Sequence, residues 1–161
     1  GLTTLQQRVR GKCLAATGRL IQGRDICLSV TRNPPQDADA WVDLGFISWK
    51  MGDYRRLSIC GNEISKLAPA AVEGPLFIGK AAQQAGNNVL AANSLELAAS
   101  LSKNKELAGW IVTSAMQTNG KSAPVLQEAP NMQAKTAEKV IVEPILGLVE
   151  GSEPLVTVPQ N

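Results

Sequence analysis

The chain has 161 residues, of which 44% are apolar and 19% charged, and its mean hydropathy is −0.03. These values are typical of a globular domain and not of a disordered or membrane protein. The sequence contains no histidine, which excludes a Ser-His-Asp triad, a Cys-His pair and a histidine-bearing zinc site within it. Its net charge of +2 is too small to indicate nucleic-acid binding by itself.

Glycines recur along the chain at an interval of 34 residues. Two parallel series share this interval: Gly11, Gly45 and Gly79, and Gly18, Gly52 and Gly86. Pro35 and Pro69 repeat the same interval, so the chain contains an internal repeat. We expect each repeat to be a pair of antiparallel helices, in units covering residues 4–37, 38–71 and 72–105, followed by a capping helix at 106–119.

The first unit is strongly basic, because residues 1–32 hold six basic residues and one acidic residue. Arg8 and Lys12 lie one helical turn apart and could contact phosphates or an acidic patch on a protein. The aromatic residues expected of a single-strand binder are absent from residues 1–40. We therefore favour a solvated basic face and keep nucleic-acid association as an alternative.

The second unit shows the helix-pair pattern most clearly. Asp37 is the predicted N-cap of its first helix, and Gly52 suits the left-handed conformation that ends this helix. Gly45 and Gly61 fall in helix interiors, where each costs about 1 kcal/mol relative to alanine. Such glycines are expected where another helix approaches too closely for a side chain. Trp41 is expected to be structural.

The run Trp41-x-x-Leu44-Gly45, followed by Gly52-Asp53-Tyr54 and Pro69, resembles the tetratricopeptide repeat (TPR), whose period is 34 residues. The resemblance covers roughly residues 4–120 and is strongest in the second unit. The third unit has Pro75 in place of the tryptophan, which is tolerated in the first turn of a helix. The resemblance implies an all-α fold, a right-handed superhelical array of antiparallel helix pairs (a TPR-like α-solenoid) with an extended C-terminal tail.

Residues 121–161 depart from the repeat and contain five of the nine prolines. This composition predicts either a Pro-rich extended arm or a disordered tail. An arm would lie on a partner or fold back along the repeats through spaced apolar side chains. These residues are Val140, Ile141, Val142, Ile145, Leu146, Leu148 and Val149.

The resemblance also implies which residues bind a partner. In tetratricopeptide repeats the contacts usually come from fixed positions of each unit's first helix, on the concave face of the array. In this sequence those positions are Leu5, Arg8, Lys12, Asp39, Val42, Phe46, Trp49, Lys50, Glu73, Leu76, Lys80, Gln83, Gln84, Trp110, Ser114 and Gln117. Aromatic residues beside lysines would suit an extended peptide with apolar and acidic side chains. The alternative for Trp49 and Trp110 is packing against a neighbouring repeat.

Signatures of enzymes, cofactors and metals are missing. Gly11-Lys12 lacks the upstream glycine and the following Ser or Thr of a phosphate-binding loop. Asp37, Asp39 and Asp43 lie at a helix start, where carboxylates interact favourably with the helix dipole, and do not indicate a metal site. We therefore expect no catalytic activity, no cofactor and no bound metal.

The three cysteines include no Cys-x-x-Cys pair. Free thiols packed as small apolar groups are expected, which weakly favours a reducing intracellular compartment. The alternative is a bond between Cys13 and Cys27 across two adjacent helices.

No run of apolar residues is long enough to span a membrane. The sequence thus predicts a non-catalytic protein–protein interaction module, an adaptor or assembly subunit that binds a partner segment in the concave face. The alternatives are a structural subunit packed in a large complex through the C-terminal arm, and nucleic-acid association through the basic N-terminal helices.

Overall fold

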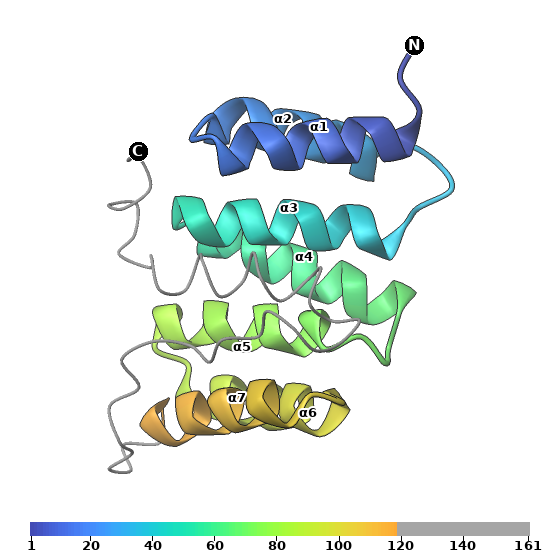
Figure 1. The fold of residues 1–161 in the computed structure, drawn as a ribbon. Coiled ribbons are helices and arrows are strands. Elements are labelled where there is room, and N and C mark those ends of the chain that lie inside the picture. Colours follow the sequence, from blue (N-terminus) through green and yellow to red (C-terminus); the bar gives the residue numbers. More distant parts are fainter. Residues whose placement is uncertain (119–161) are drawn as a thin grey trace.

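A computed structural model describes residues 1–118, which form seven α-helices and no strand (Figure 1). The helices are α1 (Thr4–Ala16), α2 (Leu20–Thr31), α3 (Ala38–Met51), α4 (Tyr54–Leu67), α5 (Glu73–Ala85), α6 (Asn88–Leu101) and α7 (Lys105–Thr118). The predicted all-α class is confirmed for this part of the chain. The predicted arm, including residues 140–149, lies outside the described residues.

Helices that follow one another in the sequence also pack against one another. Each helix from α1 to α6 contacts the next one along the chain, and α1 makes a further contact with α3. In Figure 1 the helices succeed one another down the molecule, from α1 and α2 at one end to α6 and α7 at the other. The packing of adjacent helices is therefore repeat-like. No helix within residues 1–118 is both long and apolar enough to cross a bilayer.

The turns between paired helices are made by the predicted glycines. Gly18, Gly52 and Gly86 have φ angles of 89°, 75° and 78°, in the left-handed region that only glycine enters without strain. At the start of α3, the Asp37 carboxylate accepts a hydrogen bond of 2.9 Å from the backbone N–H of Asp39. The predicted N-cap and the predicted left-handed turn are both confirmed.

The interior glycines lie where helices meet. A Cβ atom at Gly61 in α4 would stand 2.8 Å from the carbonyl oxygen of Gly74 and 2.9 Å from the backbone nitrogen of Ile78, both in α5. A Cβ atom at Gly45 in α3 would collide with the ring of Phe77. The expected close approach is confirmed at both positions.

The core runs along the whole helix array and is mostly aliphatic. Leu44, Leu57, Ile64 and Leu95 have no exposed surface, and Trp41 packs against this core while partly buried. Pro75 is the third residue of α5. It therefore lies in the first helical turn, as predicted, where no intrahelical hydrogen bond needs its missing N–H.

Candidate functional site

The predicted partner-binding residues of α3 meet α5 through an aromatic cluster. The rings of Phe46 and Phe77 stand edge to face, with centroids 5.2 Å apart and planes at 82°. Trp49 also stands edge to face against Phe77, at 6.1 Å and 84°. Such arrangements are favourable for aromatic pairs. Phe77, which the sequence did not single out for this face, therefore joins the two helices.

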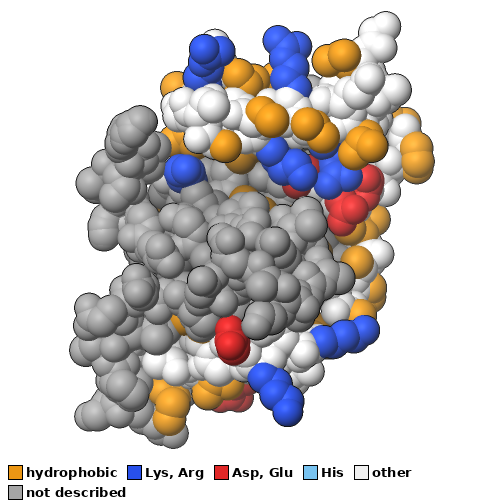
Figure 2. Space-filling view, viewed as in Figure 1, with side chains coloured by type: hydrophobic (Ala, Val, Ile, Leu, Met, Phe, Trp, Pro, Cys, Tyr) orange, Lys and Arg blue, Asp and Glu red, His pale blue; other side chains and the backbone are white. Residues whose placement is uncertain are grey.

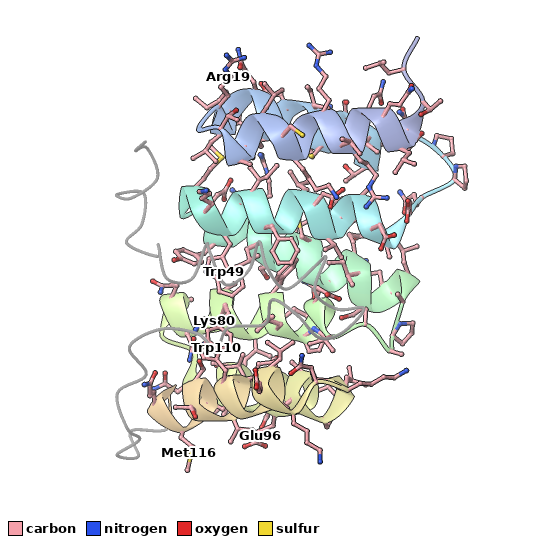
Figure 3. The ribbon with its side chains drawn as sticks, viewed as in Figure 1. Arg19, Trp49, Lys80, Glu96, Trp110 and Met116 are labelled. Atoms are coloured by element: carbon pink, nitrogen blue, oxygen red, sulfur yellow. The ribbon has the colours of Figure 1, made fainter. Side chains whose placement is uncertain are left out.

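Lys80 continues this face from α5 to α7. Its Nζ lies 5.6 Å from the centroid of the Trp110 ring, a cation–π contact. Figure 3 shows Trp49, Lys80 and Trp110 one below the other on successive helices of the array. No carboxylate within residues 1–118 forms an ion pair with Lys80. Desolvation lowers the pKa of Lys80 to about 8, because the charged ammonium is partly removed from water.

Burial divides the predicted residues of α3, α5 and α7 into two groups. The floor, as we name it, consists of Val42, Phe46, Trp49, Leu76 and Trp110, each at most 5% exposed. The rim, as we name it, consists of Lys50, Lys80, Gln83, Gln84 and Gln117, each partly or fully exposed. Together they form a continuous apolar surface bordered by polar side chains.

The remaining predicted residues of these helices differ in exposure. Asp39 is exposed, whereas Glu73 and Ser114 are buried. The Gln83 side-chain amide donates a hydrogen bond of 3.0 Å to the backbone carbonyl of Ser114. This bond ties the rim of α5 to α7 and so helps to hold the two helices in register.

Arg8 and Lys12 are engaged with carboxylates of the next unit. Arg8 Nε lies 2.7 Å from Asp43 Oδ2, and Lys12 Nζ lies 3.6 Å from Asp43 Oδ1. Arg8 also lies within 3.8 Å of carboxylate oxygens of Asp37 and Asp39. Figure 2 shows basic and acidic side chains meeting on this side of the molecule. The basic face predicted for the first helix is therefore partly neutralised by ion pairs between α1 and α3.

The interpretation of Asp43 as a carboxylate placed for the helix dipole is wrong. Asp43 is 4% exposed and is the partner of both basic residues. Burial raises the pKa of Asp43, and the nearby Arg8 and Lys12 oppose that rise. Arg8 precedes Asp43 by 35 residues, one more than the repeat, so the repeat itself could have indicated that the two side chains meet across neighbouring first helices.

All three cysteines are free thiols. The alternative bond between Cys13 and Cys27 is not formed, although α1 and α2 pack together. Cys13 is exposed, and burial raises the pKa of Cys27 and that of Cys60 to about 12. The described part of the chain holds no group of three or more His, Cys, Asp or Glu side chains arranged to bind a metal ion.

No protein-family model matches this sequence, and no curated protein is detectably similar to it. The floor and the rim are thus the features from which a function can be argued.

Proposed function

We propose that this chain is a non-catalytic protein–protein interaction module that binds an extended segment of a partner across α3, α5 and α7. The supporting observation is the floor of apolar side chains bordered by a polar rim. Protein interfaces have this composition, with aromatic anchors at the centre and polar groups around them. In keeping with the resemblance to tetratricopeptide repeats, the proposed architecture is a right-handed superhelical array whose concave side carries this face.

The chemistry of the face indicates what the partner segment contains. The floor offers aromatic and aliphatic contact area, which suits apolar side chains spaced along an extended backbone. Lys50 and Lys80 on the rim favour carboxylates nearby. For Lys80 the preference is strong, because a partly buried ammonium without a carboxylate has lost hydration that an ion pair would partly replace. We therefore propose a partner segment that is apolar and acidic.

The ion pairs of α1 favour a protein partner over a nucleic acid. Phosphate binding requires basic side chains whose charge is available to the backbone of the nucleic acid. Arg8 and Lys12 already share the buried carboxylate of Asp43. Binding phosphates through them would mean breaking these contacts or adding an anion beside existing ones.

A charge reversal on the rim tests the proposal. The variant Lys80→Glu should lose the partner proteins that co-purify with the full chain, because it places a second negative charge beside an acidic segment. The matched control is Lys66→Glu, in a side chain of α4 that is 69% exposed. Circular dichroism of both variants checks that the helices are intact. Equal recovery of partners by the two variants would refute binding at this face.

A further inference from the structure

Two turns of α3 are covered on every side. Residues 42–49 are all buried, and eight consecutive residues span more than two turns of an α-helix. The described neighbours account for three sides, because α4 and α2 pack on α3, Asp43 faces α1, and Phe77 of α5 lies against Gly45. In Figure 1 no described helix lies in front of α3 and α5. The floor is on the remaining side.

The floor is unfavourable as a surface in water. It combines two tryptophans, a phenylalanine and two aliphatic side chains on adjacent helices, and contiguous apolar patches of this kind are normally covered by a partner. Lys80 adds a partly desolvated positive charge beside Trp110. An occupant that matches this face must therefore supply apolar side chains together with at least one carboxylate.

Residues 140–153 of the same chain have this chemistry. They hold seven aliphatic residues spaced along the segment, together with Glu143, Glu150 and Glu153. The chain contains no lysine or arginine after Lys139. The segment is therefore complementary to the floor in its apolar side chains and to Lys80 in its charge.

The chain is long enough to bring this segment to the floor. The described structure ends at Thr118 in α7, and 22 residues separate it from Val140. Fully extended, that linker spans about 75 Å. The floor extends from α7 across α5 to α3, and packed helices lie about 8–10 Å apart, so the segment needs to cross only about 20 Å.

We propose that residues 140–153 bind the floor of their own chain, with a glutamate of the segment paired to Lys80. A tethered segment of this kind has an effective concentration on the order of millimolar. It therefore competes with any partner that uses the same face, and a partner must displace it. The inference rests on the proposed function only in assigning both occupants to one surface.

Zero-length cross-linking tests where the segment lies. Equal amounts of unlabelled and nitrogen-15-labelled full chain are mixed at low micromolar concentration and treated with a carbodiimide, which joins amines to carboxylates in direct contact. We expect Lys80 to be joined to Glu143, Glu150 or Glu153 within single chains. Cross-links spread evenly over Lys66, Lys80 and other lysines would overturn the proposal. Links between labelled and unlabelled chains would make the occupant a second copy, and would also overturn it.

A second measurement uses the tryptophans of the floor. The variant Ile145→Asp should make Trp49 and Trp110 more accessible to acrylamide, which increases quenching of their fluorescence in the full chain. The matched control is Val158→Asp, which adds the same charge beyond the proposed segment. Equal quenching in the two variants would contradict self-binding.

The two proposals can fail separately. If Lys80→Glu loses partners while cross-links remain unspecific, the face binds partners without the segment. If the cross-links form and no partner depends on Lys80, the segment covers a structural surface.

Discussion

The close approach of α4 and α5 makes Gly61→Ala the sharpest test of the packing. The added Cβ atom would stand 2.8 Å and 2.9 Å from two backbone atoms of α5. Backbone atoms cannot rotate away as a side chain can, so the two helices must separate. Overpacking of this kind costs about 1–3 kcal/mol, and contacts with rigid atoms on two residues place this case at the upper end.

Part of that cost is offset because alanine is the better helix former. The gain over glycine is about 1 kcal/mol in a helix interior, which leaves a net loss of about 2 kcal/mol in the free energy of unfolding. For a domain of this size the unfolding temperature should fall by about 7 °C, at about 3–4 °C per kcal/mol.

Gly109→Ala in α7 is the matched control. Gly109 is exposed, and no heavy atom of the described residues lies within 4 Å of the position of its Cβ. The same substitution should therefore raise the free energy of unfolding by about 1 kcal/mol. Urea unfolding of both variants measures the difference, which isolates the steric effect because the helix-propensity gain is common to them. If Gly61→Ala were as stable as the original chain, the close approach would be refuted.

Three other features of the structure can be tested in the same way. Arg8→Met should lower the free energy of unfolding by about 3 kcal/mol, because it leaves the buried carboxylate of Asp43 poorly paired. This deficit should shrink as the pH falls from 7 toward 4, because the pKa of Asp43 is already raised by burial and rises further without Arg8, so the folded state takes up the proton more readily than the unfolded chain; a deficit independent of pH in urea titrations would contradict the ion pair. In the native protein only the exposed Cys13 should react rapidly with a maleimide, since burial raises the pKa of the other two thiols to about 12; equal rates at all three sites by mass spectrometry would be inconsistent with this burial. Gly52→Ala should lose about 1 kcal/mol in thermal unfolding because φ is 75°, and Gly52→Asn should lose less; an alanine variant with unchanged stability would argue against the left-handed turn.

Local features of the fold were predictable from the sequence. Gly52 and Pro75 act within a few residues of themselves, through backbone dihedral angles that other residues enter with strain or cannot enter. Their consequences could therefore be read without knowing which segments meet. The interior glycines, such as Gly61, indicated that close contacts exist but not which helix makes them.

The candidate site was predictable only in part. The resemblance to tetratricopeptide repeats singled out Phe46, Trp49 and Lys80, and the structure places them on adjacent helices. It did not predict Phe77, which is fully buried and contacts both aromatic residues of α3. Nor did it predict how little of the floor is exposed, because burial depends on everything that packs around a side chain.

The sequence by itself determined the helical class and the positions of the turns, because the 34-residue glycine period acts through short-range backbone geometry. Only the tertiary structure decided what the charged side chains do. Arg8 and Asp43 are 35 residues apart and both suit a solvated helix surface, so their pairing appears only once α1 lies beside α3. The strength of that pairing comes from the exclusion of water, which is a property of the packed structure and not of either residue alone.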